Sequence, residues 1–166
     1  MKELKITKKD LDKNNYYKED SIDFDGHVTI EENLGYVKVR KSIILSGFLE
    51  AKAGSGIEAG SGIKAGWGIK AGWGIEAGSG IKAGSGIEAG DGIKAGWGIE
   101  AGWGIKAGYG IEAGWGIITK RYGKVISKFV SCFRIAVGFH IKEEQEIHAE
   151  IRKGKLILGK VIREEE

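Results

Sequence analysis

The sequence predicts an all-β protein of one domain, folded as a triangular parallel β-solenoid with about 18 residues in each coil. Three observations predict this fold class: a six-residue repeat through the middle of the chain, apolar and charged residues that alternate within each repeat, and an order of charges that fits one coil length. The 166 residues also include 29 glycines and no proline. Collagen is therefore excluded, because its chains combine glycine at every third position with abundant proline.

The repeat runs from Ala53 to Ile117, and each copy, called a hexad below, reads Ile, Glu or Lys, Ala, Gly, a variable residue, Gly. A period of six does not match the 3.6 residues of a helical turn, but it fits a short strand followed by a bend. In such a strand the Ile and the Ala face one side and the charged residue faces the other. About eleven copies in succession are the pattern of a β-solenoid, whose coils stack about 4.8 Å apart.

The coil length follows from the charged residues at the second position of ten consecutive hexads, from Glu58 to Glu112. A coil of two hexads would stack like charges in six of eight pairs, for example Lys70 with Lys82. A coil of three hexads stacks opposite charges in five of seven pairs, for example Lys82 with Glu100. Because each cross-strand pair contributes roughly 0.2–1 kcal/mol, the longer coil is favoured. We expect Ile and Ala inside this tube, with Glu and Lys outside.

The segments on either side of the repeat are less regular. Short runs of alternating apolar and polar residues predict irregular first coils over 21–52. The perfect repeat then covers 53–118. Residues 119–166 are expected to form C-terminal strands and a cap, because the end coils of a solenoid must protect unpaired strand edges. Residues 1–20 are rich in Lys, Asp and Asn, which favours a flexible N-terminal arm.

The six-residue repeat, the three-sided coil and the glycine corners resemble hexapeptide-repeat parallel β-helices. Acyltransferases with this repeat place a small residue at the fifth position, where this chain often carries an aromatic ring: Trp67, Trp73, Trp97, Trp103, Tyr109 and Trp115. The perfect repeats also leave no room for the loop on which those enzymes carry a histidine. The chain is therefore more similar to bactofilins, the polymer-forming bacterial β-helix proteins. This resemblance implies a right-handed coil and self-association.

Every Trp of the chain stands at the variable position, between two glycines. Two interpretations of these rings are open. In one, they shield the neighbouring backbone; in the other, they form an exposed aromatic ladder that binds a partner, because Trp is a leading anchor of interfaces. The candidate partner-binding rings lie at the C-terminal end of the repeat: Trp97, Trp103, Tyr109 and Trp115.

A basic segment follows the repeat, with six cations and no acidic residue from Thr119 to Lys142. Its interleaved aromatic residues are typical of nucleic-acid binders. A terminal strand pair with a basic polar face explains the same pattern without any ligand. We expect four of the cations to form an electrostatic rim beside the aromatic ladder: Lys120, Arg121, Lys124 and Lys128.

The sequence predicts no catalytic residue, no cofactor and no metal site. The histidines His27, His140 and His148 are scattered outside the repeat, and Cys132 is the single cysteine. Metal binding needs clustered ligands, which this distribution does not offer. The single cysteine and the lack of a long apolar segment favour a cytoplasmic protein without a membrane partner.

The expected function is that of a non-enzymatic, rigid solenoid that binds a protein partner as an adaptor or inhibitor, of immunity or anti-defence type. A first alternative is a self-associating, cytoskeletal solenoid of bactofilin type. A second is nucleic-acid binding through residues 119–142, although the net charge of +3 is modest for that role.

Overall fold

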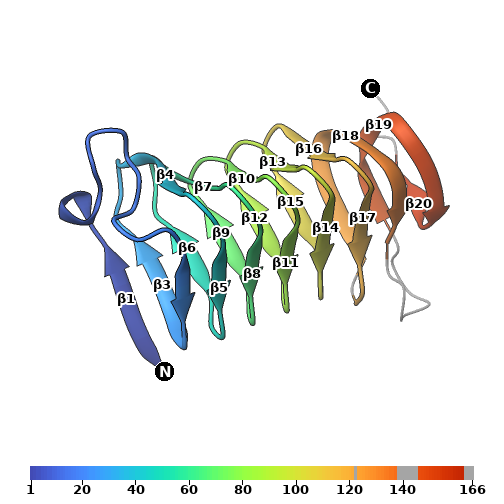
Figure 1. Cartoon of the computed structure of the whole chain (residues 1–166). Helices are drawn as coiled ribbons and strands as arrows, with labels where there is room; N and C mark the ends of the chain where they lie inside the picture. Colours follow the sequence, from blue (N-terminus) through green and yellow to red (C-terminus); the bar gives the residue numbers. More distant parts are fainter. Residues whose placement is uncertain (122, 138–145, 163–166) are drawn as a thin grey trace.

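The computed structural model shows one short strand in each hexad and a bend at each Gly–X–Gly segment. The strand consists of the Ile, the charged residue and the Ala, as in β9 (Ile69–Ala71). Three such strands complete one coil, and parallel coils stack into a β-solenoid of about seven turns with roughly 20 residues per turn (Figure 1). The structure describes residues 1–121, 123–137 and 146–162. The predicted fold class is therefore confirmed.

The stacked strands make three faces, which we number in chain order within each coil. Face 1 contains β1 (Lys2–Ile6), β3 (Gly26–Ile30), β6 (Leu49–Ala51), β9, β12 (Ile87–Ala89) and β15 (Ile105–Ala107). Face 2 contains β4 (Gly35–Val39), β7 (Ser55–Ala59), β10 (Ile75–Ala77), β13 (Ile93–Ala95) and β16 (Gly110–Ala113). Face 3 contains β2 (Ile22–Phe24), β5 (Ile43–Leu45), β8 (Ile63–Ala65), β11 (Ile81–Ala83), β14 (Gly98–Ala101) and β17 (Gly116–Thr119).

The last coils are built from longer strands. β18 (Lys124–Ala136) pairs in turn with β15, β16 and β17, so this one strand passes along all three faces. β19 (Glu146–Leu158) repeats that path on β18 with several register shifts, and β20 (Lys160–Val161) pairs with the beginning of β19. Figure 1 shows these strands at the opposite end of the stack from β1.

The coil of three hexads is confirmed within the perfect repeat. Ile75 pairs with Ile93, and Ile93 pairs with Ile111, so each partner lies three hexads further along the chain. Among the described side chains, two of the five opposite-charge pairs expected in the repeat approach to ion-pair distance: Lys82 with Glu100 at 3.2 Å and Glu88 with Lys106 at 3.6 Å.

The core is a continuous ladder of aliphatic side chains along the axis of the tube. Every Ile from Ile57 to Ile117 and every Ala from Ala59 to Ala113 is buried, and the charged residue between them faces outward, as expected. Ala53, at the start of the repeat, is exposed. Identical residues stack on one another, for example Ile81 between Ile63 and Ile99. Each buried Ile side chain contributes roughly 1.5–3 kcal/mol by leaving water.

Residues 1–20, for which the sequence favoured a flexible arm, form the first coil of the stack instead. β1 pairs with β3 along its whole length and places Ile6 beside Ile30 in the core. A 3-10 helix, η1 (Lys8–Asp10), and a bend then lead to Tyr17, whose ring is buried and whose N–H donates to the Lys38 carbonyl at 2.8 Å. The polar composition of this segment reflects its exposed outer side, while pairing supplies partners for backbone groups of β3 and β4.

The two glycines of each hexad are not equivalent. The glycine after Ala lies against the previous coil, where a Cβ at Gly96 would overlap with the carbonyl oxygen of Gly78. The glycine before Ile has more room, because a Cβ at Gly98 would stand 3.3 Å from the nearest carbonyl oxygen. Neither residue has a positive φ, so steric contact distinguishes the two positions.

We predict that Gly96→Ala and Gly98→Ala differ strongly, although both flank the same Trp97. Gly96→Ala must push two coils apart and is expected to lower the free energy of unfolding by about 1–3 kcal/mol. Gly98→Ala is expected to change it by less than about 1 kcal/mol, because a small shift relieves the contact and the unfolded chain loses entropy. Urea denaturation of both variants provides the measurement, and equal midpoints would contradict the distinction.

Candidate functional site

The variable residues of the hexads form three columns, one along each corner of the tube. Each corner is named by the two faces that it joins. Backbone hydrogen bonds link successive members, such as Trp115 N–H to the Trp97 carbonyl at 2.6 Å. Corner 1–2 carries Ser55, Trp73, Asp91 and Tyr109; corner 2–3 carries Ser61, Ser79, Trp97 and Trp115; corner 3–1 carries Trp67, Ser85 and Trp103. The four candidate rings are all exposed, but they lie on three different corners. Only Trp97 and Trp115 are neighbours in one column.

Side chains from outside the repeat contact several of these rings. The Phe133 ring meets Trp115 with centroids 6.1 Å apart, and Phe129 meets Tyr109 at 5.4 Å. A Cβ added at Gly56 or Gly74 would meet the Tyr36 ring, one at Gly110 would meet the Phe129 ring, and one at Gly47 would meet the His27 ring. Shielding of the backbone by the Trp rings themselves stays a prediction.

The four cations expected to form a rim are also distributed around the tube. The Lys120 ammonium pairs with Glu100 at 2.6 Å, and Lys124 pairs with Glu146 at 3.4 Å. Lys128 lies over the Tyr109 ring, 5.5 Å from its centroid, while the Arg121 N–H donates to the Gly102 carbonyl at corner 3–1. The segment encircles the tube, so its cations point in different directions.

An exposed apolar surface lies on face 3, toward the C-terminal end. A shallow groove of about 730 Å³ runs along this face. Its C-terminal part, with the adjoining ring of Phe133, contains four exposed apolar side chains: Trp115 (63% exposed), Ile118 (42%), Phe133 (56%) and Ile157 (55%). Arg134 also lines the groove, and its guanidinium lies 5.3 Å from the centroid of Phe133. We call Trp115, Ile118, Phe133, Arg134 and Ile157 the face-3 patch.

The sequence held one signal for this patch. Ile118 occupies the second position of its hexad, where the ten preceding hexads carry Glu or Lys, and it pairs with Glu100 of the coil before. An apolar residue therefore replaces a charged one on the outer side of the sheet. Phe133 and Ile157 could not be assigned to this surface from the repeat, because β18 and β19 lie beyond it and their mutual pairing contains register shifts.

A charged cluster adjoins the patch in the same column of face 3. The Glu100 carboxylate forms ion pairs with the Lys82 ammonium at 3.2 Å and with the Lys120 ammonium at 2.6 Å. Partial burial raises the pKa of Glu100, but the hydrogen bonds and charges of Lys120 and Lys82 outweigh it and hold that pKa below its usual range. Glu100 therefore stays ionised at neutral pH, and the three charges limit the apolar patch on its N-terminal side.

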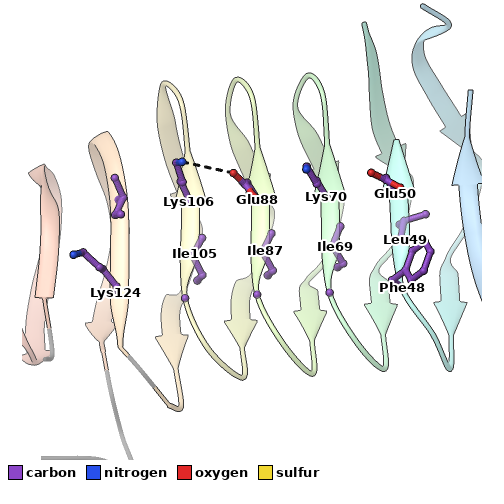
Figure 2. A pocket seen from close by; sticks show the side chains of 14 residues that line it. Phe48, Leu49, Glu50, Ile69, Lys70, Ile87, Glu88, Ile105, Lys106 and Lys124 are labelled. Carbon is purple, nitrogen blue, oxygen red and sulfur yellow. Dashed lines mark ion pairs between the residues drawn. The ribbon is translucent and has the colours of Figure 1, made fainter. Parts of the chain in front are cut away.

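A second groove, of about 450 Å³, lies on face 1 and is more polar at its rim (Figure 2). A column of glycines at 68, 86 and 104 forms part of its lining, and Phe48 and Lys124 stand near its two ends. Along one side runs a row of alternating charges: Glu50, Lys70, Glu88 and Lys106. The outer side chains of this groove thus already pair with one another in part, as Lys106 does with Glu88.

The histidines and the cysteine have structural environments. His27 stacks on Phe48 with ring centroids 4.1 Å apart, and its Nδ1 accepts the Phe48 N–H at 3.0 Å. His148 Nε2 lies 2.8 Å from the carboxylate of Glu146, and His140 lies outside the described residues. In the described parts of the chain, no group of three or more His, Cys, Asp or Glu side chains is placed to hold a metal ion.

Cys132 is buried in β18, and burial raises the pKa of its thiol to about 11. We predict that the native thiol reacts slowly with iodoacetamide at pH 8, because the reactive thiolate is scarce and the sulfur is inaccessible. Unfolding in urea should restore ordinary reactivity. The same shift stabilises the fold up to the unfolded thiol's pKa near 9, and this contribution is lost as the pH rises toward 11. Rapid native labelling, measured by mass spectrometry, would contradict the prediction.

Comparison with known proteins finds no match for this chain. No family model, no curated protein and no solved structure matches the sequence or the fold. No helix within residues 1–121, 123–137 and 146–162 is long and apolar enough to cross a membrane. The fold and its surface define a parallel β-solenoid with an exposed apolar patch at one end of one face.

Proposed function

We propose that the protein is a non-enzymatic scaffold that binds a partner protein through the face-3 patch. The observation that carries this proposal is the exposure of Trp115, Ile118, Phe133 and Ile157 side by side with the Arg134 guanidinium. Exposed apolar patches of this kind mark protein interfaces, and aromatic residues and Arg are enriched in their energetically dominant centres.

The rigidity of the scaffold supports the same proposal. Trp115 is held by backbone hydrogen bonds to the coils on both sides, from its own N–H to Trp97 and from the Arg134 N–H to its carbonyl at 2.9 Å. A ring presented on a stacked sheet loses little conformational entropy on binding, which favours affinity. An adaptor or an inhibitor of immunity or anti-defence type would use such a preformed surface.

Nucleic-acid binding has less support from the geometry. Among the described residues, the cations of the basic segment do not form one continuous patch, and Lys120 and Lys124 already pair with carboxylates. Lys142 lies outside the described residues. Nucleic-acid affinity depends on several cations that contact phosphates together. The face-3 patch, by contrast, is mainly apolar.

Self-association of bactofilin type is a second candidate, and the C-terminal coil favours it. Among the described residues, β19 has a partner on its outer edge only at Glu146 and Ile147, which pair with β20. The inward-facing Ile151 and Leu156 of the same strand are partly exposed. An open strand edge with apolar side chains is a template for another chain.

We predict that Ile118→Lys abolishes partner binding without affecting the fold. Lys82 and Lys64 occupy the equivalent outward position in the same column, so the substitution extends an existing pattern. A photoreactive benzoylphenylalanine at position 115 should cross-link one protein in the cells that express the chain. The same group at position 67, on corner 3–1, is the matched control. Ile118→Lys should reduce the cross-linked yield at least about tenfold, the size expected for a hot-spot residue.

The mass of the product distinguishes the candidates. A product of one distinct partner, lost in Ile118→Lys but present in Lys82→Ile, supports the scaffold proposal. A product of twice the mass of the chain supports self-association instead. Equal yields from positions 115 and 67 would refute the assignment of the patch. Urea midpoints of all variants must match the wild type, so that a lost product is not attributed to unfolding.

A further inference from the structure

Corner 1–2 lies opposite face 3 in each coil. It carries another arrangement of aromatic rings and charge. Trp73, Asp91 and Tyr109 stand on three successive coils. The Asp91 N–H donates to the Trp73 carbonyl at 3.4 Å, and the Tyr109 N–H donates to the Asp91 carbonyl at 3.1 Å. All three side chains are exposed or partly exposed. The backbone positions that carry the two rings therefore lie two coils apart, about 9.6 Å, and the coil between them carries a carboxylate.

Each ring contacts a side chain from another coil. On the N-terminal side, Trp73 contacts the Tyr36 ring with centroids 6.0 Å apart. On the C-terminal side, Lys128 follows Tyr109 in the column and lies over its ring at 5.5 Å. These contacts support the two rings, and Asp91 stands on the coil between them.

The surface of face 2 has an opening beside Asp91. The side chains of Tyr36 and Phe129 cover the glycines of the coils before and after it, Gly56, Gly74 and Gly110. At Gly92, apart from its chain neighbours, the described atom nearest to the position of a Cβ is a carbonyl oxygen of the next coil, 3.4 Å away. A ligand group can therefore approach the backbone at Gly92, between the coils of the two rings.

Acidic groups outnumber basic ones around this opening. Burial, followed by the charges of Glu76 and Asp91, raises the pKa of Tyr36, because both carboxylates lie near its hydroxyl. Glu58 contributes to the same effect. The nearby cations are Lys128 over Tyr109, Lys94, which stacks between Glu76 and Glu112, and Lys38, which pairs with Glu58 at 3.5 Å.

We propose that Trp73, Asp91 and Tyr109 form a binding site for an alkylated ammonium group, with its nitrogen between the rings and Asp91 as its counter-charge. A cation midway between the rings lies about 4.8 Å from each, within the roughly 6 Å range of cation–π attraction. A methylated nitrogen contacts a ring at about 4–5 Å, because only part of the C–N bond of about 1.45 Å points along the ring normal and adds to a methyl contact of about 3.5–4.0 Å. A planar guanidinium stacks closer and leaves this gap unfilled. This site goes beyond the proposed function, since face 3 takes no part in it.

Choline and its neutral isostere 3,3-dimethyl-1-butanol test the site directly. The two molecules have the same shape, and only choline carries a charge. Titration of the full chain with each, followed by the NMR shift of the Trp73 indole N–H, should give saturable binding of choline and at least about tenfold weaker binding of the isostere. Equal shifts with both molecules, or none with choline, would overturn the proposal.

Two variants test the named residues, and the repeat indicates that both will fold. Asp91→Asn removes the charge and keeps the shape. Tyr109→Ser removes one wall and places there the residue that Ser55 supplies in the same column. Each should weaken choline binding at least about tenfold. Trp115→Ser, on corner 2–3, is the matched control and should leave binding unchanged. Unchanged affinity in Asp91→Asn contradicts the assignment.

An equivalent site can be engineered at corner 3–1. Trp67, Ser85 and Trp103 repeat the order of ring, small residue and ring, but without a charge. Ser85→Asp should create a second choline site in the Asp91→Asn background, reported by the Trp67 indole N–H. If that variant binds no choline, the column geometry does not suffice and the proposal fails.

The source of the ammonium group is distinguished by two further probes. A peptide with trimethyllysine, compared with the same peptide with unmodified lysine, represents a protein side chain. Vesicles of phosphatidylcholine, in a sedimentation assay, represent a lipid headgroup. Binding of either probe that is lost in Asp91→Asn supports the site and identifies its source, while binding of both that ignores Asp91→Asn refutes it.

Discussion

The close approach of successive coils at the glycine after each Ala is the constraint on which the rest of the structure depends. At this point the backbone of one coil lies against the carbonyl of the coil before it, as at Gly96 and Gly78, and no side chain fits between them. The strands can then pair in parallel at each face, and the Ile and Ala side chains stack on identical neighbours. The stacking in turn brings each variable residue onto a corner column.

Because the backbone and the core are fixed by Ile, Ala and Gly, the remaining two positions of each hexad are free to vary. The outward charged position tunes the interaction between coils, as Lys82 and Glu100 illustrate. The corner position accepts Ser, Asp, Tyr or Trp in the same backbone setting. Both candidate sites therefore depend on which residues share a column, together with side chains from the flanking coils.

The sequence predicted the parts of the fold that follow from periodicity: the solenoid, the coil of three hexads and the inward Ile and Ala. It also contained the reason why the candidate rings separate, since Trp97, Trp103 and Tyr109 come from consecutive hexads and so fall on successive corners. The first coil could not be predicted, because β1 is short and its partner β3 lies outside the repeat. The face-3 patch combines Ile118 with Phe133 and Ile157, whose placement depends on the irregular register of β18 and β19.

The relation of three hexads to one coil restricts how this chain can change in length. Gain or loss of three hexads within the repeat would lengthen or shorten the rod by one coil, about 4.8 Å, and keep every later residue on its own corner. Gain or loss of a single hexad would rotate all that follows by one third of a turn. The face-3 patch would then face a different direction relative to the first coil, although each hexad would keep its local structure. Duplication of such a repeat therefore offers two separate kinds of variation, in length and in the angle between the two ends.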